Sequence, residues 1–153
     1  MKIALASDLH LEFGDIELKN TENADILVLA GDICVIDHFR YGNRYSTRYF
    51  EFFERVSKEF PEVIYILGNH EFYDYEIVAA EAKVKECLNH LPNIHILCDE
   101  TYDLDGYTIT GNEFTVIATP YAVVDEIIDE LGLGTEPTDL NFYPYAKLRT
   151  AER

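Results

Sequence analysis

Short apolar segments alternate with polar turns along the first hundred residues of the chain. Three of these segments, 2–7 (KIALAS), 25–30 (DILVLA) and 62–67 (EVIYIL), are nearly continuous apolar runs bordered by small and polar residues. Runs of this length, rich in Ile, Leu and Val, are typical of strands buried on both faces of a parallel sheet. We therefore expect three such strands.

Two other segments have the spacing of amphipathic helices. From about residue 45 to 59, the apolar side chains that recur at helical spacing are Tyr49, Phe52, Phe53 and Val56. Phe60-Pro61 ends this helix, because a residue before proline disfavours helical backbone. Asp74 is expected to cap a second helix that reaches about Leu91. Its inward face is predicted to hold Ile77, Val78, Ala80, Val84, Cys87, Leu88 and Leu91.

Further strands are predicted after the second helix. Residues 93–97 (NIHIL) form a fourth strand, and shorter pieces follow at 101–104, 107–110 and 114–118, with Asp105-Gly106 as a hairpin turn. Beyond Pro120 the pattern favours a helix at 121–131 and a loop at 132–137 but leaves the fold of 120–153 open.

The alternation of strands and helices predicts an α/β fold: a layered, mostly parallel central sheet flanked by helices. With 153 residues, the chain has the length of a single domain, 1–153.

Polar residues follow the three best strands. Asp8 and His10 come after the first, Asp32 after the second, and Asn69 and His70 after the third. Binding sites in such sheets gather at the carboxyl ends of the strands. These nitrogen and oxygen donors suit Mn, Fe or Zn better than thiolate-loving ions.

In this order, SDLH, AGD and GNHE resemble the first three signature blocks of the calcineurin-like metallophosphoesterases. The wider segments ASDLHLEF, ADILVLAGDI and VIYILGNHEFY are similar to small bacterial and phage members of that family. The likeness covers about residues 1–111, and the assignment of 112–153 stays open. It implies the metallophosphoesterase fold, incomplete at its C-terminal side, and metal-dependent hydrolysis of a phosphomonoester or phosphodiester by a dinuclear centre.

The resemblance also implies roles for single residues. Asp8 and His10 would bind the first metal, Asp32 would bridge both, and Asn69 would bind the second through its carbonyl oxygen. His70 would be the catalytic residue beside the phosphate, as a proton donor or as a partner for charge in the transition state. Glu71, in contrast, is assigned a structural role in holding its loop.

The family usually supplies three further histidines, but the last histidine here is His95. His95 is interpreted as a structural residue of its strand and His90 as a surface residue. The second metal position is therefore expected to be weak or empty. Three explanations stay open: a shortened enzyme, a natural short protein that has lost catalysis, or ligands from a partner chain. The alternative function is a metal- or nucleotide-binding module, or a protein-interaction module.

The charge limits the partners. The net charge is −17, and no Lys or Arg lies between Lys85 and Lys147. Such a surface repels phosphate backbones, so nucleic-acid coating is not expected. A small phosphoester is the substrate that the resemblance implies. The apolar runs are too short to span a membrane. The three cysteines, an odd number with no paired spacing in the sequence, fit reduced thiols in a cytoplasmic protein. Nothing in the sequence indicates an oligomer.

Arginines and tyrosines alternate after the Asp32 block. Arg40, Arg44 and Arg48 recur at every fourth residue, beside Tyr41, Tyr45 and Tyr49. If this segment were helical, each set would form a stripe. The arginines would then either steer phosphate toward the metals or form a solvated helix face while the tyrosines pack on the core.

Overall fold

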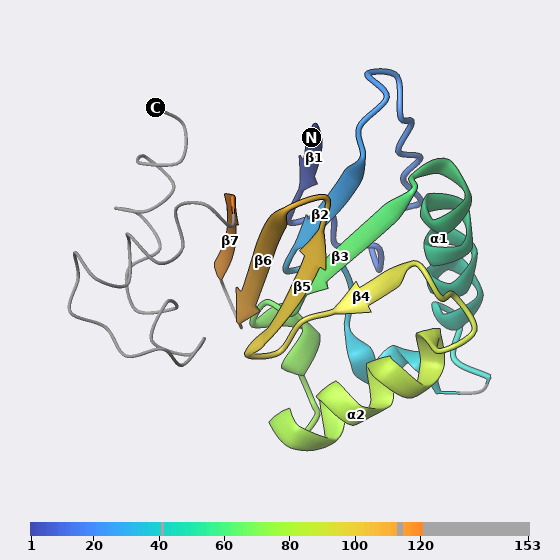
Figure 1. Cartoon of the computed structure of the whole chain (residues 1–153). Helices are drawn as coiled ribbons and strands as arrows, with labels where there is room; N and C mark the ends of the chain where they lie inside the picture. Colours follow the sequence, from blue (N-terminus) through green and yellow to red (C-terminus); the bar gives the residue numbers. More distant parts are fainter. Residues whose placement is uncertain (41, 113–114, 121–153) are drawn as a thin grey trace.

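The computed structural model describes residues 1–40, 42–112 and 115–120 (Figure 1). The predictions for residues 121–153 lie outside this part of the chain.

Four parallel strands form the first sheet. They are β1 (Ile3–Ala6), β2 (Ile26–Ala30), β3 (Glu62–Ile66) and β4 (Ile94–Ile96), in the spatial order β1-β2-β3-β4. Two helices and two single 3-10 turns connect them, namely α1 (Ser46–Glu59), α2 (Ile77–Leu88), η1 (Ile36–Phe39) and η2 (His70–Phe72). The predicted α/β fold with a mostly parallel sheet is confirmed.

A second, antiparallel sheet follows. It contains β5 (Glu100–Leu104), β6 (Tyr107–Asn112) and β7 (Thr115–Pro120), paired in that order. The β5–β6 turn is Asp105-Gly106, with φ angles of 49° and 81°. Two successive positive φ values are what a tight two-residue hairpin requires. The hairpin predicted at this dipeptide is therefore confirmed.

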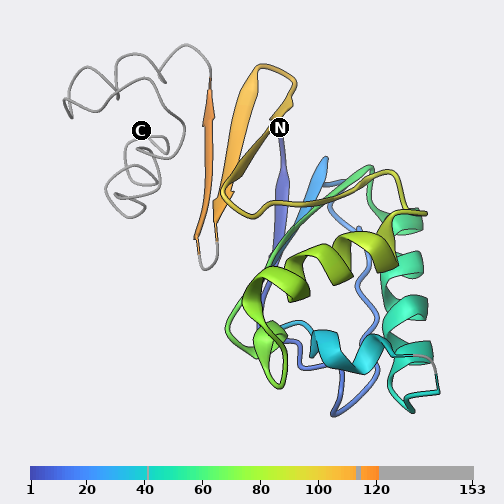
Figure 2. The same cartoon turned by 90° about the horizontal axis from the view of Figure 1, so that it is seen from below.

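Each face of the parallel sheet has its own core. The helices cover one face, where Phe52, Phe53 and Val56 of α1 join the same buried cluster as Leu27 and Tyr65 (Figure 2). On the other face, the smaller cluster contains Ile26 and Val28 of β2, Ile64 and Ile66 of β3, Leu97 just after β4, and Ile109 of β6. The described part of the molecule is therefore layered as helices, parallel sheet and antiparallel sheet.

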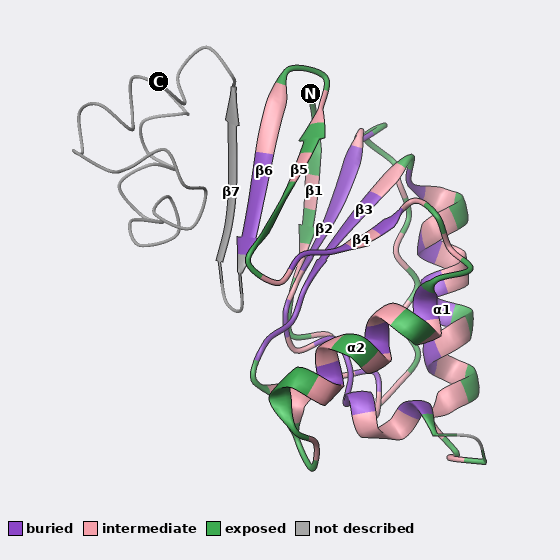
Figure 3. Cartoon of the chain, turned by 60° about the horizontal axis from the view of Figure 1, so that its bottom comes forward, coloured by how far each residue is buried: buried purple, intermediate pink, exposed green. Residues whose placement is uncertain are grey.

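The first strand differs from its prediction. Burial on both faces holds for β2 and β3, but Ile3 and Leu5 of β1 are 44% and 72% exposed (Figure 3). β1 is an edge strand of its sheet and packs on the helical side through Ala4 and Ala6. An apolar run alone does not tell whether its strand lies at an edge.

The second helix is shorter than predicted. It begins at Ile77. The residue at the N-cap position, Glu76, makes no capping hydrogen bond through its side chain. Asp74 lies upstream with a φ of 59°, so it is a turn residue and the prediction that it caps the helix was wrong. Ile77 and Val78 are exposed, whereas Ala80, Val84 and Leu88 form the buried stripe. None of the described helices has the length and apolar character needed to cross a bilayer.

Candidate metal centre

The loops that follow β1 and β2 continue to pair after the strands end. The backbone N–H of Asp8 donates to the carbonyl of Gly31 at 3.0 Å, and that of His10 donates to the carbonyl of Asp32 at 3.1 Å. The backbone N–H of Leu11 then donates to Ile33 at 2.9 Å. These bonds fix the register of the two loops, so that the residues after the two strands lie side by side.

Three candidate ligands have left-handed backbone conformations. The φ angles are 55° for Asp8, 45° for His10 and 55° for Asp32. This region costs an L-residue about 1–2 kcal/mol. Strained residues of this kind cluster at functional sites, where the surrounding structure holds them in place. The strained segment is therefore consistent with a binding site.

The same three side chains converge. Asp8, His10 and Asp32 each offer a ligand atom, and these atoms lie within 4.8 Å of one another. A cavity of about 150 Å³ opens beside them, lined by Asp8, Ala30, Gly31, Asp32, Gly68 and Asn69. The loops after β1, β2 and β3 thus all contribute to one small polar hollow.

Asn69 lies at this cavity with its amide oriented by a neighbour. Its Nδ2 donates to the hydroxyl of Tyr73 at 3.3 Å. The carbonyl oxygen Oδ1 is the atom of the amide that can bind a cation. Three of the four predicted metal ligands, Asp8, Asp32 and Asn69, thus line one cavity, and His10 lies beside two of them. The ion that each would bind remains a prediction.

Glu71 holds two of the three loops from inside the protein. The residue is fully buried, and Oε2 accepts hydrogen bonds from the backbone N–H groups of Asp32 and Gly68, both at 2.9 Å. Oε1 accepts from the backbone N–H of Ile33 at 2.7 Å and from the Tyr65 hydroxyl at 2.8 Å. Burial raises the pKa of Glu71, and these donors partly offset that effect. Its predicted structural role is confirmed.

His70 lies against the proposed ligands. Its backbone N–H donates to Oδ1 of Asp32 at 2.9 Å. Its ring centroid is 4.5 Å from that of His10, edge-on at 88°, and 4.5 Å from that of Tyr73. The predicted catalytic histidine is therefore adjacent to the cluster.

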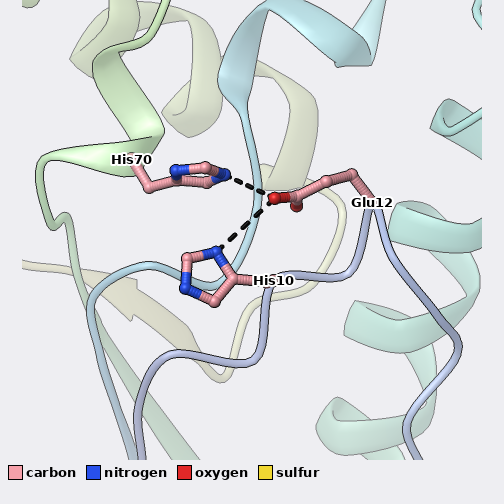
Figure 4. Close-up of side chains that lie close together, drawn as sticks. All are labelled: His10, Glu12 and His70. Atoms are coloured by element: carbon pink, nitrogen blue, oxygen red, sulfur yellow. Dashed lines mark hydrogen bonds and ion pairs between the residues drawn. The ribbon is translucent and has the colours of Figure 1, made fainter.

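Glu12 is a site residue that the sequence interpretation missed. Its carboxylate contacts the ring nitrogen Nε2 of His70 and lies 3.5 Å from Nδ1 of His10 (Figure 4). Together His10, Glu12 and His70 form a second group of side chains that could hold an ion. The available signal was the Asp-x-His-x-Glu spacing of residues 8–12.

Among the other histidines in the described segments, His95 and His90 have the surroundings expected of them. Nε2 of His95 is 2.7 Å from a carboxylate oxygen of Glu62, and its ring stacks on Tyr102. His90 is exposed. His38 pairs through Nδ1 with the hydroxyl of Tyr49 at 3.0 Å. None of the three belongs to either group of candidate ligands.

The arginines do not form a helical stripe, because α1 begins only at Ser46. Arg40 pairs with Asp37, and Arg44 contacts the ring and hydroxyl of Tyr45. Arg48 instead donates from Nη1 to the carbonyls of Leu11 and Glu12, at 2.7 and 3.2 Å. Among the tyrosines, Tyr49 is buried as predicted for core packing, and Tyr41 lies outside the described residues.

Comparison with known proteins agrees with this geometry. The family model of the calcineurin-like phosphoesterases matches residues 1–140. An uncharacterized protein of Acanthamoeba polyphaga mimivirus is 31% identical in an alignment of 123 residues, and the match covers 69% of this chain and 41% of the viral protein. The chain therefore spans less than half the length of this relative.

Proposed function

Because this chain belongs to the calcineurin-like phosphoesterase family, we propose that it hydrolyses phosphomonoesters or phosphodiesters with the help of divalent metal ions. The observation that carries the proposal is the convergence of Asp8, His10 and Asp32 within 4.8 Å, beside the cavity that Asn69 also lines. Oxygen and imidazole donors of this kind suit Mn, Fe or Zn.

The residues fit a cation on electrostatic grounds. Two carboxylates at this separation repel each other unless a positive charge or a proton lies between them. Asp8 and His10 would hold the first ion, Asp32 would contact both ions, and Asn69 would hold the second through Oδ1. The first ion would thus have three of these ligands and the second only two. We therefore propose that the second ion binds more weakly.

When bound, such ions polarise phosphoryl oxygens and activate water for attack at phosphorus. The residues of the chain itself would hold the ester in position and supply a proton. His70 is tied through its backbone to Asp32, so its ring stays next to the metal ligands. We assign to it the transfer of a proton to the leaving oxygen, or the stabilisation of charge that develops there.

The proposed substrate is small and phosphorylated. The net charge of −17 opposes binding of a nucleic-acid backbone, whereas a small ester needs only the cavity and its metals. The chain has three cysteines, an odd number, and Cys34 is buried, which supports a reducing compartment such as the cytoplasm.

The test is turnover of p-nitrophenyl phosphate and bis(p-nitrophenyl) phosphate with Mn²⁺. We expect metal-dependent release of nitrophenol from at least one ester, lost in Asp32→Asn and reduced about 10²–10⁴-fold in His70→Ala. Asp74→Asn is the matched control, since Asp74 shares the left-handed backbone (φ 59°) but is exposed outside the site. Equal rates in Asp32→Asn and the unsubstituted chain would rule the proposal out.

A metal- or nucleotide-binding module without turnover is the second candidate. The small number of ligands available to the second ion, Asp32 and Asn69, favours it. Calorimetric titration with Mn²⁺ separates the two functions. Tight binding of a single ion with no hydrolysis of either ester supports the module, whereas binding accompanied by hydrolysis supports the enzyme.

A further inference from the structure

The side chain of Glu12 is directed into the protein rather than into solvent. It is only 8% exposed, and one oxygen, Oε1, faces ring nitrogens of both His10 and His70 (Figure 4). Two imidazoles from separate loops thus meet at a single carboxylate oxygen.

The backbone around Glu12 is held from several sides. Leu11 is fully buried, and its N–H donates to Ile33. The N–H of Phe13 donates to the carbonyl of His10 at 2.9 Å, which closes a turn around Glu12. Arg48 of α1 donates to the carbonyls of Leu11 and Glu12. The carboxylate therefore reaches the histidines from a fixed segment, not from a free surface loop.

A carboxylate in contact with one nitrogen of an imidazole fixes the orientation of the ring and the tautomer it adopts. In His70, Nε2 contacts Glu12, and the other nitrogen lies on the opposite side of the ring (Figure 4). In His10, Nδ1 faces Glu12, which leaves Nε2 as the nitrogen available to an ion. One acid can thus orient a metal ligand and the catalytic histidine together.

We propose that Glu12 is a positioning residue shared by His70 and His10: it holds the proton of His70 on Nε2 by a hydrogen bond, and its charge faces the ring of His10, whose Nδ1 lies 3.5 Å away without a hydrogen bond. The consequence for turnover rests on the proposed function. The arrangement itself does not, because it rests only on the position of the Glu12 carboxylate beside the two rings.

The decisive experiment is therefore made on the metal-free chain. The ring nitrogens of histidine have well-separated ¹⁵N chemical shifts when protonated and unprotonated, so they report the tautomer. We expect His70 to carry its proton on Nε2 in the unsubstituted chain and to become a mixture of tautomers in Glu12→Ala. Glu12→Gln, which keeps a neutral acceptor, should lie between the two.

Glu17→Ala is the matched control, because Glu17 lies on the same segment and is exposed and paired with Lys19. It should leave the ring signals of His70 and His10 unchanged. The backbone amide spectrum of each variant shows whether the fold is kept. Ring shifts of His70 that are identical in Glu12→Ala and the unsubstituted chain, with the fold intact, overturn the proposal. Unchanged ring shifts of His70 are also the expected result if Glu12 acts only as a ligand of the metal ion.

A second measurement connects the arrangement to the metal. Loss of a carboxylate that orients a metal-binding histidine weakens metal affinity about 10–100-fold. We expect that loss for Mn²⁺ in Glu12→Ala, and unchanged affinity in Glu17→Ala. Unchanged affinity in Glu12→Ala would remove His10 from the proposal. If the unsubstituted chain hydrolyses no ester, the proposed function fails, and the ring shifts still decide the role of Glu12.

Discussion

The backbones of Gly31 and Gly68 meet where β2 and β3 end. A Cβ added to Gly31 would lie 2.9 Å from the Cα of Gly68, and one added to Gly68 would lie 2.4 Å from Oδ1 of Asp32. Real Cβ atoms essentially never come this close to a neighbour. Gly31 also has a φ of +83°, which side-chain-bearing residues rarely adopt. The contact of these two glycines is what allows the Asp32 and Asn69 loops to share one cavity.

Gly68→Ala should therefore weaken both the fold and the metal site. Because the added methyl group must displace Asp32, we expect a loss of about 1–3 kcal/mol in the free energy of unfolding and lower affinity for Mn²⁺. Denaturant unfolding and calorimetry measure the two effects. Gly14→Ala is the control, since no atom lies within 4 Å of its added Cβ. Metal affinity equal to that of the unsubstituted chain would show that the close approach does not matter to the site.

Glu71→Gln should be strongly destabilising although it preserves shape. The amide nitrogen of glutamine would face backbone N–H groups, because both oxygens of Glu71 accept hydrogen bonds from them. A buried donor without an acceptor costs about 1–3 kcal/mol, and bonds to a charged acceptor are worth about 1.5–3 kcal/mol. We expect a loss of about 2–4 kcal/mol in denaturant unfolding. Exposed Glu76→Gln should change stability by less than about 0.5 kcal/mol, and a similarly small change in Glu71→Gln would contradict the bracing role.

Much of the fold could be predicted because its signals are local. The apolar runs marked β2 and β3, and Asp105-Gly106 marked the hairpin by its need for positive φ. The exposed face of β1 could not be predicted, because being at the edge of a sheet is a property of the whole topology. The first turn of α2 was misplaced for a similar reason, since Ile77 and Val78 are apolar yet exposed.

The part of the candidate site that lies at the carboxyl ends of the parallel strands could be predicted from the sequence. Asp8, Asp32 and Asn69 lie together because parallel strands end at one edge. Glu12 escaped prediction because the chain turns after β1, with His10 in a left-handed conformation, so alternation along an extended strand no longer tells where a side chain points. Its contact with His70 joins residues 58 positions apart, which no local pattern encodes.

Bound metal should reverse the order of stability between Asp8→Asn and the unsubstituted chain. Without metal, Asp8→Asn should be no less stable than the unsubstituted chain, because it removes repulsion between Asp8 and Asp32. With Mn²⁺ at 100 times its dissociation constant, the unsubstituted chain should gain about 2.7 kcal/mol, and the variant much less. Thermal unfolding with and without Mn²⁺ measures both. Asp74→Asn should gain as much as the unsubstituted chain, and a full gain in Asp8→Asn would exclude Asp8 as a ligand.

Arg48→Ala should impair the site from a distance. The Arg48 guanidinium binds the carbonyls of Leu11 and Glu12, and its removal leaves those carbonyls without their charged donor. Hydrogen bonds from charged groups contribute about 1.5–3 kcal/mol, so we expect a stability loss toward the lower end of that range.

The loss should also appear at His70, because the segment that carries Glu12 is held to α1 by Arg48. The ¹⁵N signals of the His70 ring should move in the same direction as in Glu12→Ala, but by less. Arg40→Ala is the control: Arg40 belongs to the same run of arginines but is 65% exposed and pairs with Asp37. If Arg48 were a phosphate-steering residue only, its removal would raise the Michaelis constant and leave stability and the metal-free ring signals unchanged. A shift in the metal-free spectrum therefore separates support of the loop from contact with the substrate.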